Sequence, residues 1–444
     1  MGVQRFRAYS PNEDFLLPPS IREWVPEDHL ANFISETVDT LDLSPIIDDY
    51  DNSDGGQAPF HPVMMTKLLV YAYCVGIMSS RKIELNTYEA VPFRMLSVDQ
   101  HPDHDTINEF RKRHLTAFGS IFLMVLQLAQ KVGLVKLGHV ALDGTKIKAS
   151  ASKHKAMSYA YIPKKVQQLR DEIKQLLDEA DAIDQAEDKR YGKGKRGNEL
   201  PTELRFRKQR LQRILEAKQA LEAETRAEVR LTGQAKGKPA DVTGVQPKPN
   251  AQYNFTDPDS RIMKDGATQG IVQAFNGQLA VDAESQIIVA AAVTQEQNDK
   301  HQVEPMVELI KANLGELPEV MTMDNGYYTD DNVKYLEEKG IDGYIATGRV
   351  KHGDAIPAAP HGRIPKRLTI KERMTRKLRT LKGRATYAKR KGIAEPVIGQ
   401  IKQVRGFRQF LLRRLTKVPR EFDLVCLTHN LLKIFRYNWK PALA

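Results

Sequence analysis

With 444 residues, the chain is too long for one ordinary hydrophobic core, so we expect two or three domains. Its two cysteines, Cys74 and Cys426, have no Cys-x-x-Cys or Cys/His spacing, which argues against structural zinc and for a reducing, cytoplasmic compartment. The N-terminus lacks the apolar stretch of a signal peptide, and no apolar window reaches the length of a membrane span. These features predict a soluble protein without a membrane partner.

The formal net charge of +11 is concentrated in one segment. Residues 366–391 contain twelve Lys or Arg and a single acid, Glu372, so this segment alone has a net charge of +11. The rest of the chain is therefore close to neutral. A surface this basic is suited to follow a phosphate backbone, and a solvated helix face is the alternative interpretation.

Residues 1–134 have the pattern of helices, and we expect them to form a DNA-binding domain. Apolar residues recur at helical spacing over 30–41, and the stretch 62–77 is apolar nearly all round. A third helix is predicted where Thr106 and Glu109 have capping-box spacing, and basic residues follow. Three such helices fit either a helix-turn-helix-like DNA reader or a plain helical bundle.

A strand pattern begins in residues 135–156 and is interrupted by residues 157–232. The interruption has two helical segments joined by a basic loop, which predicts an antiparallel coiled hairpin inserted into the strand domain. Its apolar seam consists of Val166, Leu169, Ile173, Leu176, Ala180 and Ile183, followed by Leu204, Leu211, Ile214 and Leu221.

Residues 250–444 contain the rest of the strand domain and the basic C-terminal helices. Three strands are predicted first, with hairpin turns at Gly277–Gln278 and at residues 283–286. Helix, strand, helix and strand follow, so the whole predicts a mixed sheet flanked by helices.

Two acids close apolar strand patterns: Asp143 ends GHVALDG, and Asp324 ends EVMTMDNGYY. An acid at the carboxyl end of a strand is held rigidly at the sheet edge, where α/β sites lie. Mg²⁺ binds carboxylate oxygens and keeps several waters, and two such ions about 3.5 to 4 Å apart support phosphodiester cleavage. A capping role in the following turn is the alternative for Asp324.

A third acid, Glu395, precedes Pro396, which suits the first turn of a helix and places Glu395 at the helix entry. An ordinary N-terminal helix acid is the alternative for Glu395. From Val397 onward an apolar stripe through Val404 is expected to face the core, while Lys402 shares the opposite stripe with Glu395.

Taken together, several motifs resemble the DDE transposases of bacterial insertion sequences. They are VALDGTK, TMDNGYY and the run Y-x-x-R-K-x-x-x-E-x-x-x-x-x-x-K, which is typical of the branch with the Y-R-E-K signature. PFHPVMMTKLLVYAYCVGIMSSRKIE, PDHDTINEFRKRH, NFTDPDSRIM and GFRQFLLRR are also similar to that branch, so the likeness covers nearly the whole chain.

The resemblance implies an RNase H-like catalytic core with a helical N-terminal domain, in the mixed α/β class. The predicted hairpin lies between the first and second strands of this core, whereas some relatives insert a β-rich module after the last strand. It implies a catalytic and metal-binding triad of Asp143, Asp324 and Glu395, with two Mg²⁺ or Mn²⁺ ions. Such enzymes nick transposon ends and join the 3′-hydroxyl to target DNA, so we expect end and target DNA as partners and a homodimer at the bacterial nucleoid. The residues expected to contact DNA are Tyr387, Arg390, Lys391, Lys402 and Arg405.

This chain departs from the family pattern at two positions. Four residues instead of the usual three separate Arg390 from Glu395, so either Arg390 or Lys391 fills the arginine position. Arg414 stands where a glycine often follows the arginine. Two alternatives to a transposase are a domesticated, non-catalytic DNA-binding relative and a metal-dependent nuclease without strand transfer. Should one acid of the triad prove dispensable, Asp299 is the next candidate.

Overall fold

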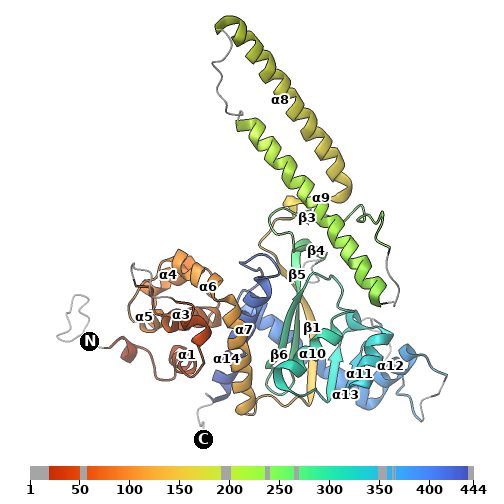
Figure 1. Ribbon diagram of the computed structural model, residues 1–444. Coiled ribbons are helices and arrows are strands. Elements are labelled where there is room, and N and C mark those ends of the chain that lie inside the picture. Colours follow the sequence, from red (N-terminus) through yellow and green to blue (C-terminus); the bar gives the residue numbers. More distant parts are fainter. Residues whose placement is uncertain are drawn as a thin grey trace, which may run out of the picture.

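The computed structural model describes residues 20–50, 58–191, 202–235, 241–264, 270–348, 358–362, 365 and 367–438. Figure 1 shows a helical N-terminal part, a central sheet with helices packed around it, and a long two-helix hairpin that projects from the sheet. Most of the predicted basic hairpin loop lies outside the described residues, as does Lys366. No described helix combines the length and apolarity that a membrane crossing requires.

The N-terminal part consists of short helices packed around α3. The helix α3 is apolar on nearly all sides, which explains its central position. Ten of its side chains are buried, including Leu68, Leu69 and Val70. The helices are α1 (Leu30–Asp39), α2 (Ser44–Ile47), α3 (Pro62–Cys74), α4 (Ser80–Glu89), α5 (Val91–Ser97), α6 (His104–Arg113) and α7 (Leu115–Lys131).

The start of α6 differs from the predicted capping box. Asp103, not Thr106, caps the helix, because its carboxylate accepts from the Thr106 N–H at 2.7 Å. The basic residues of α6 are engaged within the protein. Arg111 is buried and donates to Met78 O at 2.9 Å, and Arg113 pairs with Asp49 at 2.6 Å. These contacts favour the helical-bundle interpretation for this helix.

The central sheet is mixed, as predicted. β1 pairs antiparallel with β5 and parallel with β7, β7 pairs parallel with β8, and β5 pairs antiparallel with both β4 and β6. The strands are β1 (His139–Lys148), β4 (Arg261–Lys264), β5 (Ile271–Asp282), β6 (Ile288–Thr294), β7 (Val320–Met323) and β8 (Asp342–Ile345).

One predicted turn was wrong. β5 runs straight through Gly277 and Gln278, and Gly277 serves packing instead: a Cβ there would lie 3.0 Å from the Phe422 ring. The other predicted turn is correct, since β5 and β6 are joined by a turn over residues 283–285.

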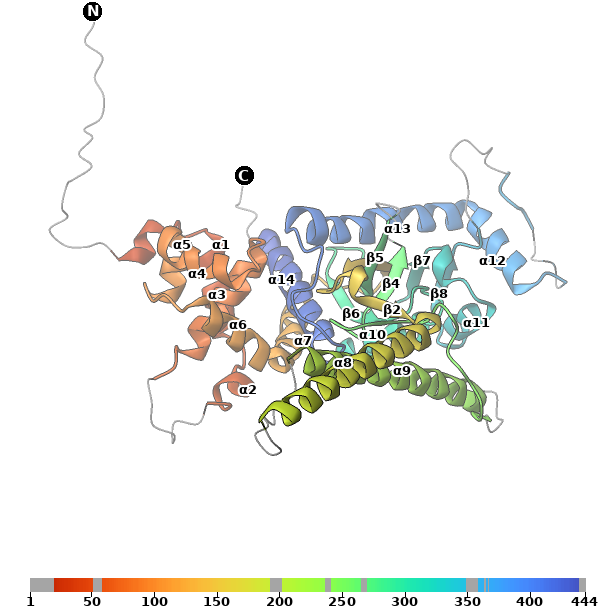
Figure 2. The ribbon, with the colours of Figure 1, turned by 90° about the horizontal axis from the view of Figure 1, so that it is seen from above.

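Helices cover both faces of the sheet. Figure 2 shows α13 along one face, with α10 on the other. α14 packs against β6 and against α3 and α7, and so joins the N-terminal helices to the sheet. These helices are α10 (Val303–Leu314), α11 (Asp330–Glu338), α12 (Ile370–Arg379), α13 (Leu381–Gly399) and α14 (Val418–Asn438). Single turns are η1 (Ile21–Trp24), η2 (Lys153–Lys155), η3 (Tyr159–Tyr161), η4 (Asn325–Tyr327) and a π-helical turn η5 (Gln400–Val404).

The hairpin insertion is confirmed and has its own small core. It consists of α8 (Ile162–Tyr191) and α9 (Thr202–Ala235), and the strands β2 (Ala156–Ser158) and β3 (Gln252–Asn254) pair at its base. Four of the predicted seam residues and Ile162 form an apolar cluster separate from the main core. They are Ile162, Val166, Leu169, Ile214 and Leu221.

Candidate active site

Asp143 and Asp324 lie at equivalent positions on neighbouring strands. The parallel ladder of β1 and β7 ends with the pair Leu142 and Met323, and each acid is the next residue. β7 ends there, whereas β1 continues to Lys148 along β5, so Asp143 lies inside its strand and not at its end. In-register parallel strands lie about 4.8 Å apart, which brings the two acids to the same edge of the sheet.

The Asp143 carboxylate is largely buried, with 14% of its side chain exposed. Burial raises the pKa of Asp143 to about 6; the Arg390 guanidinium opposes this shift, and the charges of Asp324 and Glu395 add to it. One oxygen, Oδ1, accepts from the Gly144 N–H at 2.9 Å. The three acids therefore share one electrostatic environment, in which negative charges oppose one another.

Asp324 also caps the turn that follows it, as the alternative predicted. Its Oδ1 accepts from the Gly326 N–H at 2.7 Å, while among the described residues no protein donor contacts Oδ2. Capping therefore fixes the carboxylate without using both oxygens, so this role is compatible with metal binding.

Glu395 does not open a helix. α13 begins at Leu381, is capped by Thr380 and continues through Pro396, so Glu395 lies within its last two turns. Its side chain is 53% exposed. A helix normally breaks at an internal proline because the carbonyl four residues earlier loses its donor. Here that carbonyl, Gly392 O, accepts from the Gln286 side chain at 2.8 Å.

Arg390 connects the helix acid to the strand acid. Its Nη1 donates to Asp143 Oδ2 at 3.1 Å, and its Nη2 lies 3.7 Å from Glu395 Oε1. The Arg390 side chain is 11% exposed, whereas Lys391 points to the exposed surface. The geometry thus favours Arg390 over Lys391 for the arginine position of the motif. The Tyr387 ring lies beside the guanidinium, with 6.0 Å from Arg390 Cζ to its centroid.

Lys402 contacts β1 from the turn after α13. Its ammonium donates to Lys146 O at 2.9 Å and to Thr145 Oγ1 at 3.2 Å. The π-helical turn η5 widens the helix here and includes Val404, whose side chain is 77% exposed, contrary to the predicted core stripe.

Arg405 is not at a surface, which corrects its expected role in DNA binding. It is 6% exposed, and its Nη1 donates to Thr428 Oγ1 at 2.7 Å and to Val425 O at 3.2 Å. The wide turn directs this side chain into the core against α14. We therefore do not retain it among the proposed DNA contacts.

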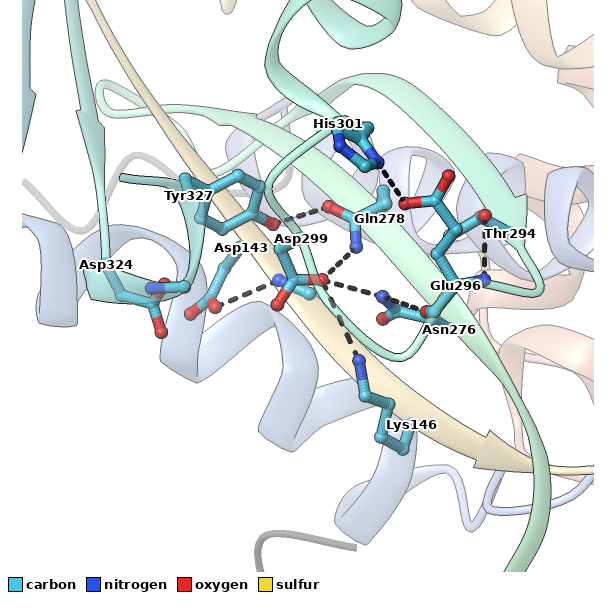
Figure 3. Close-up of polar contacts among 12 residues, drawn as sticks. Asp143, Lys146, Asn276, Gln278, Thr294, Glu296, Asp299, His301, Asp324 and Tyr327 are labelled. Atoms are coloured by element: carbon cyan, nitrogen blue, oxygen red, sulfur yellow. Dashed lines mark hydrogen bonds and ion pairs between the residues drawn. The ribbon is translucent and has the colours of Figure 1, made fainter. Parts of the chain in front are cut away.

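A fourth carboxylate, Asp299, lies beside Gly144 and Gly326, which follow Asp143 and Asp324 in the sequence (Figure 3). Its Oδ1 accepts from Asn276 Nδ2 at 2.6 Å and from Gln278 Nε2 at 2.7 Å, and the Lys146 ammonium lies 3.7 Å away. A Cβ at Gly144 would lie 2.7 Å from Asp299 Oδ1, so this site requires the glycine.

Sequence reasoning missed Asn276, Gln278 and Lys146. The signal was available in strand alternation, because Gly144 pairs with Gln278 and Lys146 with Asn276, which puts all these side chains on one face. That face is opposite to Asp143 on β1, since successive side chains alternate. The β1–β5 register was needed to see this grouping.

The residues fit divalent ions by their chemistry, although the acids are not assembled as ligands. Among the described residues, no three Asp, Glu, His or Cys side chains are close enough to form a metal-binding group. The donor set of Asp143, Asp324 and Glu395 offers only oxygen atoms, as Mg²⁺ and Mn²⁺ prefer. The positive charge of Arg390 offsets the mutual repulsion of these acids. A divalent cation would replace or supplement that charge.

The basic segment continues from α12 into α13. Lys377 pairs with Asp342 at 2.6 Å and Arg390 with Asp143, so part of its charge is used internally. The residues of this segment that are exposed among those described are Arg367, Lys371, Arg373, Arg379, Lys382, Lys389 and Lys391.

Two family matches cover separate parts of the chain. Residues 19–113 match the family described as Transposase domain (DUF772), and residues 242–431 match the family described as Transposase DDE domain. The second match includes Asp324 and Glu395 and implies an RNase H-like core, the fold class expected from the sequence. The second match begins after Asp143. The parallel pairing of β1 with β7 places Asp143 in register with Asp324, which the match includes. No match was found among the curated proteins or the solved structures.

Proposed function

Because this chain belongs to the DDE transposases of insertion sequences, we propose that it binds the ends of its own element and catalyses DNA strand cleavage and strand transfer. The register of Asp143 and Asp324 at the end of one parallel ladder carries the proposal. We also assign the chain to the Y-R-E-K branch, on Tyr387, Arg390, Glu395 and Lys402. With DNA as the substrate, the protein acts at the bacterial nucleoid.

In this proposal the strand acids and Glu395 hold two divalent ions, Mg²⁺ or Mn²⁺. When bound, the ions activate the attacking water or 3′-hydroxyl and stabilise charge on the leaving oxygen. The Gly144 and Gly326 amides orient the two aspartates, because each donates to one carboxylate oxygen. Arg390 keeps Asp143 ionised in its buried position by opposing the upward shift of its pKa.

DNA contacts are proposed for the surface around α12 and α13. The exposed Lys391 and the half-buried Tyr387 lie about one and two turns before Glu395 on α13, so a phosphate backbone passing Glu395 would lie within their reach. Arg390 and Lys402 lie between this DNA path and β1, and their hydrogen bonds to β1 hold α13 and the turn after it against the sheet. The N-terminal helices and the hairpin are proposed to read or grip end DNA, with the protein acting as a homodimer.

An assay on the element's own ends tests this function. The purified protein is incubated with Mg²⁺, a target plasmid and a labelled duplex that carries the terminal inverted repeat flanking the gene. We expect a nick at the repeat boundary and joining of the 3′-hydroxyl end to the plasmid. A duplex with a scrambled repeat is the control. Cleavage without joining would favour the nuclease alternative, and binding without cleavage would favour the domesticated relative.

A further inference from the structure

The turn between β5 and β6 reaches the catalytic helix through one side chain. Gln286 has a φ of +58°, in the left-handed region, and its side chain points out of this turn. Its amide Nε2 donates to Gly392 O on α13 at 2.8 Å, and its Oε1 accepts from Lys433 on α14 at 2.6 Å. The Gln286 carbonyl also accepts from His429 Nε2 at 2.9 Å. One residue therefore connects the sheet edge with two helices.

The Gly392 carbonyl, which accepts from Gln286, is the carbonyl that Pro396 leaves without a donor inside the helix. In an α-helix the N–H of residue 396 would donate to the carbonyl of residue 392, and proline has no N–H. An unpaired carbonyl and the proline ring together bend or open a helix at this point. The Gln286 amide takes the place of the missing donor, and the helix continues.

Glu395 lies in the short stretch of α13 between the supported Gly392 carbonyl and Pro396. Its side chain is half-exposed, and among the described residues its one ion pair is the 3.7 Å contact with Arg390. Its position therefore depends on the path of the α13 backbone more than on side-chain packing. A shift of that backbone would move Glu395 relative to Asp143, which is fixed in the sheet.

We propose that Gln286 is a positioning residue for the active site, which holds Glu395 in place by supplying the hydrogen bond that Pro396 removes from α13. This inference rests on the proposed function of Glu395. The bond itself is a property of the free protein, so it is testable without metal or DNA.

Four variants of the full-length protein separate positioning from stability. Gln286→Gly removes the amide but keeps a residue that favours positive φ, so the turn itself is not strained. Pro396→Ala restores the N–H that bonds Gly392 within the helix. The third variant combines both changes. Lys433→Met is the matched control, because it removes the other amide contact and leaves the Gly392 bond.

Amide hydrogen exchange of residues 388–404 is measured first, on protein without metal or DNA. In Gln286→Gly we expect exchange in this segment about tenfold faster than in the unaltered protein, since local opening is easier when a helix carbonyl lacks a donor. Pro396→Ala combined with Gln286→Gly should return exchange to the level of Pro396→Ala alone. Lys433→Met should leave the segment unchanged.

Single-turnover cleavage of end DNA is the second readout. Gln286→Gly should cleave about ten to a hundred times more slowly, because small misplacements of a reacting group are costly, and the Mg²⁺ concentration for half-maximal rate should rise. Its affinity for end DNA should not change. The double variant should cleave like Pro396→Ala.

The inference is overturned by unchanged exchange in Gln286→Gly, by an equal loss in the Pro396→Ala background, or by the same effect in Lys433→Met. Faster exchange with an unchanged cleavage rate would also overturn it, because the bond would then support the helix without positioning Glu395. If hydrogen exchange changes among the variants as expected but the unaltered protein cleaves no end DNA, the proposed function fails. The hydrogen-bond support of α13 then still stands.

Discussion

Arg390 donates to Asp143 across 247 residues of sequence, at 3.1 Å, and thereby joins α13 to the central strand β1. The same guanidinium lies 3.7 Å from Glu395. A single cation thus offsets the repulsion of two acids that a divalent ion would also attract. The charge balance of the site in the free protein depends on this residue.

Replacing Arg390 by Gln should make the protein depend more on metal for its stability. Without metal, removing one partner of a largely buried ion pair costs about 3 kcal/mol, so the melting temperature should fall. Excess Mg²⁺ should then raise the melting temperature more in this variant than in the unaltered protein, because the cation replaces the missing positive charge. Thermal melts with and without Mg²⁺ measure both. Lys391→Gln, at the exposed neighbour, is the control; equal Mg²⁺ shifts in all three proteins would contradict the charge argument.

The three acids should be needed for cleavage but not for DNA binding. Asp143→Asn, Asp324→Asn and Glu395→Gln each keep the shape of the side chain and remove a charged ligand, so cleavage should fall by several orders of magnitude. Binding to end DNA in a gel shift should persist or tighten, since one charge that repels phosphate is gone. Ca²⁺ should support assembly but little cleavage.

A neutral variant that cleaves near the normal rate in Mg²⁺ would remove that residue from the triad. Asp299→Asn is the informative comparison, because Asp299 lies beside Gly144 and is held by two amide groups. If Asp299 supports the segment before α10 and takes no part in cleavage, replacing it should lower the melting temperature more than the cleavage rate.

Arg414 occupies a backbone conformation that suits glycine. Its φ is +75°, and its N–H donates to Asp257 Oδ1 at 3.2 Å, a bond that any residue except proline can make. Arg414→Gly should therefore stabilise the protein by about 1 kcal/mol, in the range expected for relieving left-handed strain. Urea unfolding measures this. Arg414→Ala, which keeps the strain, should give no gain, and an equal gain from both would mean that the arginine side chain itself is destabilising.

The sequence predicted the parts of the site that depend on local pattern. Asp143 and Asp324 follow apolar strand runs, and parallel pairing then brings the acids to one edge. The position of Glu395 within its helix was not predictable, because α13 continues through Pro396 and the Gly392 carbonyl accepts from Gln286, a donor 106 residues earlier. A local rule for proline cannot include a distant donor.

The misplacement of Arg405 has a similar physical origin. The π-helical turn η5 inserts extra backbone into the last helical turn, and the residues at its end and after it are rotated relative to an ideal helix. Val404 is therefore exposed and Arg405 buried, the reverse of the arrangement expected from helical spacing. Nothing in the local composition indicates the wider turn.

The basic segment should bind phosphates without reading sequence. Replacing the exposed residues Arg379, Lys389 and Lys391 by Gln should weaken binding to any duplex and flatten the slope of log K against log salt by about 0.9 for each phosphate that is no longer neutralised. Titrations at several salt concentrations, with end DNA and with scrambled DNA, measure this. Lys131→Gln, an exposed site on α7, is the control. An unchanged slope would return the segment to a solvated helix face.

The hairpin should be separable from the catalytic core. Its apolar cluster is distinct from the main core, and the β2–β3 pair closes its base, so the residues of the main core stay buried without it. Replacing residues 160–249 with a short Gly/Ser linker retains this pair and should leave the melting transition of the core close to its normal temperature. We expect weaker binding to end DNA or failure to bring two ends together, measured by gel shift with one and two labelled ends. Nicking of a single end should persist, because Asp143, Asp324 and Glu395 all remain. Full transposition by the deletion variant would show that the arm is dispensable, and an unfolded variant would show that its core and the main core are one cooperative unit.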